Sequence, residues 1–276
     1  MANKQVGESM KSIKKLMDLH GRVALITGGA GHIGSAICDA LAETGANIVV
    51  IDCNKESCDT KTRQIIDEFH VQAQSIVMDL TNEPELRKIP DIVLKQFHSI
   101  DILVNCAALV GTSSLKGWGV EFNKQNADTW RMALEVNLTV PFILTQVCSE
   151  ALIQSRNGSV INIGSIYGIL GPNMQIYQGT SMGNPAAYAA SKGGLLQLTR
   201  WLSTVLSPEV RVNSITLGGV SRGQPEPFYS KYIEKTPLRR MAAEEDIKGA
   251  AVYLASDLSS YVSGQNLVVD GGYSIW

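Results

Sequence analysis

The chain has 276 residues, of which 45% are hydrophobic, and a net charge of −2. This length suits one large α/β domain or two small ones, with enough apolar residues for a buried core. The near-zero charge gives no reason to expect nucleic acid or an anionic membrane as a partner. No apolar run approaches the length of a spanning helix, and residues 1–16 form a polar N-terminal extension unlike a signal peptide. Five irregularly spaced cysteines are typical of reduced thiols, so we expect a cytoplasmic protein without a metal site.

Seven short apolar segments alternate with longer helical patterns. Their nearly continuous hydrophobicity is typical of strands that are buried on both faces in a parallel sheet. After the first of them, Ile33, Ile37 and Leu41 form an i, i+4, i+8 apolar stripe of an amphipathic helix. The expected strands are 22–27, 47–51, 75–78, 101–104, 158–163, 210–215 and 266–269. The sequence therefore predicts a single α/β domain over residues 17–276, with a doubly wound, Rossmann-type parallel sheet of about seven strands and helices on both faces.

A glycine-rich turn follows the first expected strand. Residues 28–34 read Gly-Gly-Ala-Gly-His-Ile-Gly and lead directly into the amphipathic helix. Glycines at this position let the backbone approach a pyrophosphate, which the N-terminal amides of the helix then hold. Glycine clustering alone is weak evidence, because a tight turn that binds nothing has the same composition.

Two carboxylates follow the next two strands. Asp52 ends the second strand 18 residues beyond Gly34 (52 − 34), where a carboxylate can accept both ribose hydroxyls of an adenosine and repels a 2′-phosphate. Because no arginine follows Asp52 directly, the sequence predicts NAD rather than NADP. Asp79 closes the third strand and has two interpretations: it meets the adenine edge, or it caps the helix expected to start between Thr81 and Glu85.

Tyr188 and Lys192 lie one turn apart in an expected helix. Residues at i and i+4 share a helix face. A neighbouring ammonium favours the phenolate, so Lys192 is expected to lower the pKa of Tyr188 toward the range useful for acid–base work. A Tyr-x-x-x-Lys pair by itself is a common feature of helix surfaces, so its interpretation depends on the motifs around it.

Taken together, these motifs resemble those of the classical short-chain dehydrogenase/reductase family, and the resemblance extends from about Leu19 to Tyr273. It implies an NAD(P)-dependent enzyme that acts on CH–OH groups. The motifs that carry it are, in chain order, the glycine turn, Asp52, Asp79, Asn105, Ser165 and Tyr188-x-x-x-Lys192.

The resemblance also implies a role for each catalytic residue. Tyr188 would be the general acid/base, and Lys192 would hold the nicotinamide ribose. Ser165 would hydrogen-bond the substrate oxygen, and Asn137 would hold a water for proton relay to Lys192. The cofactor-binding residues that it implies are Gly28, Gly31, His32, Ile33, Gly34, Asp52, Asp79, Leu80, Asn105, Ala107, Tyr188, Lys192, Gly218 and Val220.

Four departures from the family pattern stand out. His32 occupies a usual glycine position, Cys106-Ala107-Ala108 replaces Asn-Ala-Gly, and Leu217 replaces the proline before Gly218. The fourth departure is the separation of Ser165 and Tyr188, which is 23 residues (188 − 165) and nearly twice the usual spacing. Tyr177 stands at the usual distance, but Ser181 follows it where the lysine is required.

The surplus residues, around 173–182, are expected to lie over the catalytic cleft. They either line a polar substrate pocket or form a surface loop or oligomer contact. A Pro-rich segment, 221–240, is expected to be an irregular binding loop. The substrate-binding candidates are Gln175, Gln178, Ser181, Arg222 and Gln224.

These polar residues suggest a hydroxylated or anionic substrate. With Gln-Gly-Thr-Ser-Met before Tyr188 and Gln-Pro-Glu-Pro-Phe after the sixth strand, the chain looks like family members that are associated with bacterial surface-sugar and flagellin-modification pathways. The expected substrate is therefore a sugar or sugar derivative, with a steroid-like compound or small polyol as the next candidate. Alternatives are a 3-oxoacyl-thioester or small-ketone reductase and, from another class, a catalytically silent NAD-binding regulatory protein. The family further implies a homo-oligomer, a dimer or tetramer.

A serine hydrolase is a poor alternative. Residues 179–183 match Gly-x-Ser-x-Gly, but all four histidines lie upstream of this segment and no strand is expected before it. A Rossmann methyltransferase would explain the glycine turn but not the set of Ser165, Tyr188 and Lys192.

Overall fold

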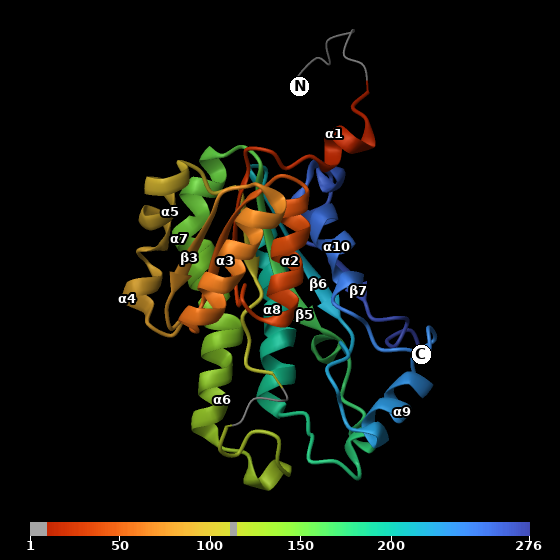
Figure 1. Ribbon diagram of the computed structural model, residues 1–276. Coiled ribbons are helices and arrows are strands. Elements are labelled where there is room, and N and C mark those ends of the chain that lie inside the picture. Colours follow the sequence, from red (N-terminus) through yellow and green to blue (C-terminus); the bar gives the residue numbers. More distant parts are fainter. Residues whose placement is uncertain (1–9, 111–114) are drawn as a thin grey trace.

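The computed structural model describes residues 10–110 and 115–276, with a seven-stranded sheet at the centre (Figure 1). The strand order is β3-β2-β1-β4-β5-β6-β7, and every neighbouring pair is parallel. The strands lie at all seven expected segments, so the predicted Rossmann-type α/β fold is confirmed. Their bounds are β1 Val23–Thr27, β2 Asn47–Asp52, β3 Ala73–Val77, β4 Ile102–Asn105, β5 Gly158–Ser165, β6 Val210–Leu217 and β7 Asn266–Val269.

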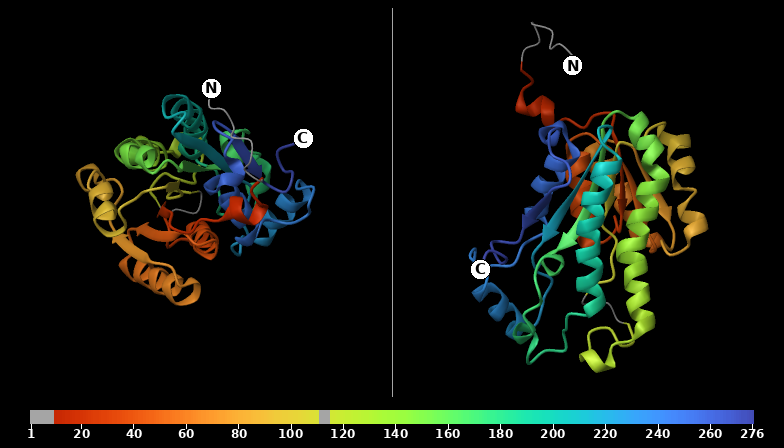
Figure 2. Two further views of the ribbon diagram at one scale, coloured as in Figure 1. Left: turned by 90° about the horizontal axis from the view of Figure 1, so that it is seen from above. Right: turned by 180° about the vertical axis from the view of Figure 1, so that it is seen from behind.

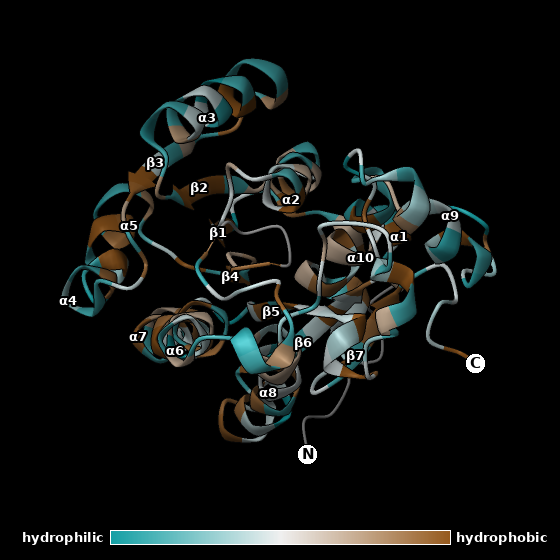
Figure 3. Ribbon diagram, turned by 90° about the horizontal axis from the view of Figure 1, so that it is seen from below, coloured by the Kyte–Doolittle hydropathy of each residue, from teal (hydrophilic) through white to brown (hydrophobic). Residues whose placement is uncertain are grey.

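Helices cover both faces of the sheet, as Figures 2 and 3 show from several sides. One layer contains α2 (His32–Glu43), α3 (Lys55–Phe69) and α10 (Glu245–Ala255). The other layer contains α4 (Glu83–Leu86), α5 (Ile89–Phe97), α6 (Ala127–Leu134), α7 (Val140–Gln154) and α8 (Ala186–Val205). The first nine residues of the predicted N-terminal extension lie outside the described residues. The rest of it carries α1 (Ile13–Met17), and the Lys11 ammonium lies 3.4 Å from the Asp257 carboxylate.

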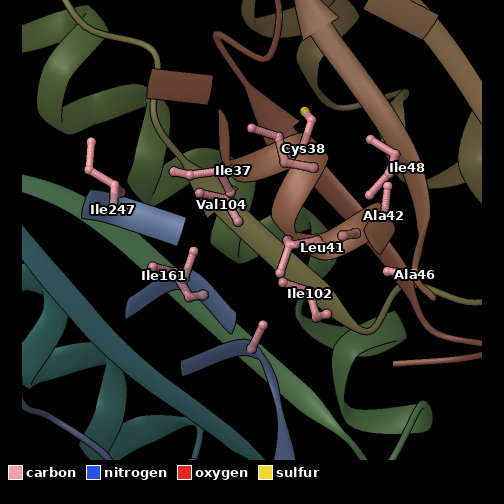
Figure 4. Close-up of a cluster of buried hydrophobic side chains, with 14 of the residues drawn as sticks. Ile37, Cys38, Leu41, Ala42, Ala46, Ile48, Ile102, Val104, Ile161 and Ile247 are labelled. Carbon is pink, nitrogen blue, oxygen red and sulfur yellow. The ribbon is translucent and has the colours of Figure 1, made fainter. Parts of the chain in front are cut away.

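Side-chain alternation along the strands divides the core in two. On β4, Val104 packs with Ile37 and Leu41 of α2 and with Ile247 of α10 (Figure 4). Its neighbour Leu103 belongs to the cluster on the opposite face, under α5 and α7. Successive residues of a strand point to opposite faces of the sheet, so a strand covered on both sides must be apolar throughout. This is the physical basis of the nearly continuous apolar runs.

Leu41→Ala is expected to lower the free energy of unfolding by about 2–5 kcal/mol. Leu41 is fully buried between the sheet and α10, so the truncation leaves a cavity that the surrounding helices cannot close. Urea unfolding followed by circular dichroism measures the change. Glu43→Ala, at an exposed position of the same helix, is the matched control. Equal unfolding midpoints for both variants would contradict this account of the core.

One helical stretch, Ala127–Gln154, is long and apolar enough to span a membrane by length and composition alone. It runs through α6, a π-helical turn at Glu135–Thr139, and α7. The expectation that no apolar run approaches this length is therefore corrected. Half of its most apolar 18-residue window is buried inside the fold, where α7 packs on β5 and α6 packs beside α8.

The Pro-rich segment 221–240 contains a helix, contrary to the prediction of an irregular loop. This helix, α9 (Glu226–Glu234), begins directly after Pro225, and it has a second proline in its first turn. Proline is well suited to the first turn of a helix, because the amide that it lacks would have no helical partner there. Phe228 and Tyr232 point from α9 into a small aromatic cluster. The prolines therefore start a helix instead of preventing one.

Candidate active site

The site lies at the carboxyl ends of β1 and β4, where the order of the strands reverses. In open α/β sheets this switch point forms the binding crevice. Two cavities meet there, with volumes of about 390 and 420 Å³, which we call the glycine-turn cavity and the catalytic cavity. They share five lining residues: Ile33, Cys106, Ala108, Val110 and Arg222.

The glycine turn forms one wall of the glycine-turn cavity. Gly28 has a φ of +64°, and a Cβ atom there would lie 2.9 Å from the Ala107 Cα. A Cβ atom on Gly34 would lie only 2.0 Å from the Gly28 carbonyl oxygen. Side chains are therefore excluded from both positions. The first amides of α2 have no carbonyl partner within the helix. This cradle fits the pyrophosphate of a dinucleotide.

Both predicted carboxylates line the glycine-turn cavity. The Asp52 carboxylate accepts a hydrogen bond from the Cys53 amide at 2.8 Å. The Asp79 carboxylate accepts bonds from the Thr81 amide and hydroxyl at 2.9 and 2.8 Å, and these bonds lower its pKa. The N-cap of α4 is Asn82, so Asp79 shapes the preceding turn and is not the helix cap itself. A contact between Asp79 and adenine stays a prediction.

The predicted cofactor residues divide between the two cavities, with one exception. Nine of them line the glycine-turn cavity: Gly28, Gly31, His32, Ile33, Gly34, Asp52, Asp79, Leu80 and Ala107. Tyr188, Lys192, Gly218 and Val220 line the catalytic cavity, as does Ile33. The exception is Asn105, which is buried in β4 and donates to the Asn162 side-chain oxygen at 2.8 Å, so it ties β4 to β5 without lining either cavity.

His32 shows how the turn tolerates an imidazole in place of glycine. Its ring is largely exposed, and its Nδ1 lies 3.6 Å from the Glu244 carboxylate. The ring therefore leans out of the turn, toward the segment that precedes α10. Three apolar residues of the wall were missed in the sequence: Met78, Leu109 and Val136. Met78 and Leu109 follow the strands β3 and β4, and this position could have indicated them, whereas Val136 lies in the π-helical turn between α6 and α7.

Ser165, Tyr188 and Lys192 meet in the catalytic cavity, although they come from different parts of the chain. Ser165 is the last residue of β5, and the other two lie in α8. Lys192 is buried, and its Nζ donates to the Ile163 carbonyl oxygen at 2.7 Å. Burial lowers the pKa of the Lys192 ammonium to about 8, because the charged form is poorly solvated there.

The structure corrects the predicted direction of the Tyr188 pKa. Burial raises this pKa, and a hydrogen bond with the Ser165 side chain only partly opposes the increase. The Lys192 ammonium, which was expected to lower it, is directed to the Ile163 carbonyl. In this arrangement desolvation of the phenolate outweighs both the hydrogen bond with Ser165 and the attraction of the Arg222 guanidinium.

Asn137 lies in the π-helical turn between α6 and α7 and is fully buried. Its side-chain oxygen accepts from the Leu109 amide at 2.7 Å. Its side-chain nitrogen donates to the Leu109 carbonyl and to the Ser191 hydroxyl, both at 3.0 Å. Asn137 thus joins the β4 loop to α8, the helix of Tyr188. Both side-chain amide hydrogens of Asn137 are used within the protein. A water held by Asn137 would therefore donate to one of its oxygen atoms, and this water stays a prediction.

The predicted substrate residues are only partly brought together. Ser181, Arg222 and Gln224 line the catalytic cavity, whereas Gln175 and Gln178 do not. The latter two side chains are exposed, and their main-chain carbonyls accept hydrogen bonds from the Lys231 ammonium at 3.3 and 2.8 Å. The prediction is corrected for this pair, because the short 3-10 helix Met174–Tyr177 buries Ile176 and Tyr177 and leaves the two glutamine side chains on the outside.

An aromatic cluster closes the far side of the catalytic cavity. It joins the insertion to α9 through Tyr177, Phe228 and Tyr232. The ring centroid of Phe228 lies 5.3 Å from that of Tyr177 and 5.8 Å from that of Tyr232. The Tyr177 hydroxyl lies 2.7 Å from that of Tyr167. Sequence reasoning considered Tyr177 only as a competitor of Tyr188 and missed its place in the wall. The apolar pair Ile176-Tyr177, which lies between two glutamines, was the available signal.

Comparisons with known proteins agree with this arrangement. The profile of the family described as Enoyl-(Acyl carrier protein) reductase matches residues 28–274. The 3-oxoacyl-(acyl-carrier-protein) reductase FabG of Thermotoga maritima is 30% identical over 94% of this chain and 100% of its own. The post-translational flagellin modification protein A of Campylobacter coli is 28% identical over 93% of this chain and 100% of its own.

Solved structures show the same similarity. A gluconate 5-dehydrogenase from Burkholderia cenocepacia, in complex with NADP and tartrate, superimposes with a TM-score of 0.85. It is 29% identical, and the match covers 96% of this chain and 100% of that one. The chain therefore belongs to the classical short-chain dehydrogenase/reductase family of oxidoreductases.

Proposed function

We propose that this protein interconverts a secondary alcohol and a ketone on a sugar or sugar derivative, with NAD(H) as cofactor and Tyr188 as general acid/base. The observation that carries the proposal is the meeting of Ser165, Tyr188 and Lys192 in one cavity that adjoins the glycine-turn cavity. This arrangement places a proton-transferring group beside a dinucleotide site. Relatives named for sugar acid and flagellin-modification chemistry support the substrate class.

Each side chain has a part in the proposed reaction. The nicotinamide supplies or accepts the hydride when bound. In the direction of oxidation, the Tyr188 phenolate takes the hydroxyl proton while Ser165 holds the same oxygen. A Lys192 pKa of about 8 keeps this side chain mostly charged near neutrality, so a cation lies in the wall of the catalytic cavity beside the proposed dinucleotide site. Reduction uses the same groups in reverse.

A substrate screen tests the proposal. The purified protein is incubated with NAD and separately with NADP, against polyols, aldonic acids, sugar phosphates and nucleotide sugars, and formation of the reduced cofactor is followed by absorbance. The expected result is turnover of at least one polyhydroxylated compound with NAD. Turnover of none of them, together with activity on an acyl thioester, would overturn the proposed substrate class.

A 3-oxoacyl-thioester reductase is the second candidate, because the matching profile and the Thermotoga maritima relative bear acyl-carrier names. Asp52 argues against it, since a carboxylate at that position repels the 2′-phosphate of the NADPH that such biosynthetic reductions usually draw on. An assay with acetoacetyl thioester and NADPH separates the two candidates.

Asp52→Ala is expected to weaken NAD binding and to strengthen NADP binding, so that the preference shifts by about tenfold or more toward NADP. The variant removes both the acceptor for the ribose hydroxyls and the charge that repels a 2′-phosphate. Titration calorimetry with each cofactor measures the shift. Glu56→Ala, at an exposed position of α3, is the charge-matched control. The gluconate 5-dehydrogenase relative is in complex with NADP. If the wild-type protein likewise binds NADP more tightly than NAD, the proposed preference for NAD is wrong.

We further propose that the protein is a cytoplasmic homo-oligomer, a dimer or tetramer. Its five thiols are all unpaired, which suits a reducing compartment. Large apolar side chains are exposed on the outer helices, including Trp130 of α6, Phe142 of α7 and Trp201 of α8. Such side chains are typical of an interface between copies. Sedimentation analysis tests the oligomeric state.

A further inference from the structure

Asn184 has a property that no other described residue of the catalytic cavity shares. The residue is 9% exposed, and its side-chain oxygen is buried without a hydrogen-bond partner. It lines the same cavity as Ser165 and Tyr188. Buried polar atoms are rarely left unpaired, so an unpaired one in the wall of a cavity requires an explanation, and a bound group that supplies the missing partner is one. The proposed reaction assigns no role to this residue.

The Asn184 amide is held in place from both sides. It lies four residues before Tyr188 (188 − 184), and Pro185 fixes the chain between it and the start of α8. Tyr177 lines the same cavity, and its hydroxyl lies 2.7 Å from that of Tyr167. The aromatic cluster and the two hydrogen bonds from Lys231 fix the insertion above it. An amide on such a rigid support can select a ligand by the position of one polar group.

We propose that Asn184 hydrogen-bonds a second hydroxyl group of the substrate, on the carbon next to the one that reacts. This inference rests on the proposed function, because Tyr188 defines the reacting carbon. A hydroxyl group both donates and accepts, so it satisfies the amide in either of its two orientations. A site built around such a bond rejects an analogue that lacks the hydroxyl, because the buried amide is then left unpaired. Asn184 thereby selects vicinal diols and polyols over simple alcohols.

The test compares butane-2,3-diol with butan-2-ol, which differ only in the neighbouring hydroxyl group. Oxidation of each by NAD is measured for the wild type, Asn184→Ala and Asn184→Asp. We expect Asn184→Ala to lower kcat/KM for the diol by about tenfold and to leave that for butan-2-ol within about twofold. Asn184→Asp keeps an acceptor at the same position and is expected to retain the preference for the diol. NAD titration and thermal unfolding of each variant check that the cofactor site and the fold are intact.

Three results would overturn the inference. An equal loss with both alcohols would show that Asn184 only supports the loop, and an unchanged diol reaction would show that it makes no substrate contact. Both of these leave the proposed alcohol chemistry standing, because butan-2-ol is still oxidised. Failure of the wild type on both alcohols and on every compound of the screen would remove the proposed function together with the inference.

Discussion

Replacing Tyr188 with phenylalanine is expected to lower kcat by about 10²–10⁴-fold and to leave cofactor affinity nearly unchanged. The substitution removes only the hydroxyl oxygen that exchanges a proton with the substrate. The ring still fills its place beside Ala187 and Trp118, so the fold of the cavity is preserved. Steady-state turnover with the best substrate of the screen and NAD titration calorimetry provide the two measurements.

Tyr261→Phe is the matched control for this experiment, because Tyr261 is fully exposed and far along the chain from the catalytic residues. It is expected to behave as the wild type. Loss of NAD binding in Tyr188→Phe would assign the tyrosine to the cofactor site instead. Unchanged turnover would remove it from the reaction altogether. A wild-type protein that binds NAD but shows no turnover would favour the regulatory alternative.

Lys192→Met is expected to abolish activity and, near neutral pH, to stabilise the protein. In the folded protein burial lowers the pKa of Lys192 from 10.5 to about 8. Below pH 8 both folded and unfolded chains carry the proton, and the folded chain bears the full desolvation penalty. Between pH 8 and 10.5 the folded chain has released the proton while the unfolded chain retains it, so wild-type stability rises across this window.

The stability advantage of Lys192→Met is therefore expected to shrink by on the order of 3 kcal/mol between neutral pH and pH 10.5. Its size at neutral pH is reduced by the loss of the hydrogen bond to the Ile163 carbonyl. Urea unfolding at several pH values measures the difference between variant and wild type. Lys95→Met, which removes an exposed ammonium from α5, is the matched control. A difference that stays constant with pH would show that burial of the ammonium carries no such penalty.

The sheet could be predicted from the sequence because its strands are covered on both faces. Burial on both sides makes a run such as Ile48-Val49-Val50-Ile51 apolar at every position, and this pattern does not depend on the rest of the fold. The helix α9 could not be read in the same way. Its prolines are common in loops, and only its packing through Phe228 and Tyr232 shows that they begin a helix.

The candidate site was predictable where local motifs determine it. Sequence spacing alone identifies the glycine turn, Asp52 and the pair Tyr188 and Lys192, because the residues that define each of them are close together in the chain. The walls of the catalytic cavity depend instead on contacts between distant segments. Gln175 and Gln178 looked suited to a polar pocket, but Lys231 and the burial of Ile176 turn them outward.

The direction of the Tyr188 pKa was missed for a similar reason. Helical spacing indicates that Tyr188 and Lys192 are neighbours, but it gives no information on burial or on the Ile163 carbonyl that receives the ammonium. Asn184 shows the same limitation. A single asparagine in a loop has no pattern, and its unpaired oxygen exists only once the insertion is folded against α9.

The two hydrogen bonds from Lys231 have a consequence for protein engineering. They join α9 to residues 175 and 178, so two segments separated by more than fifty positions form one unit above the catalytic cavity. Grafting the insertion alone onto a relative would leave its two carbonyls and Tyr177 without the partners that hold them. A transplant of substrate preference therefore has to move residues 173–184 and 222–234 together, as a single cassette.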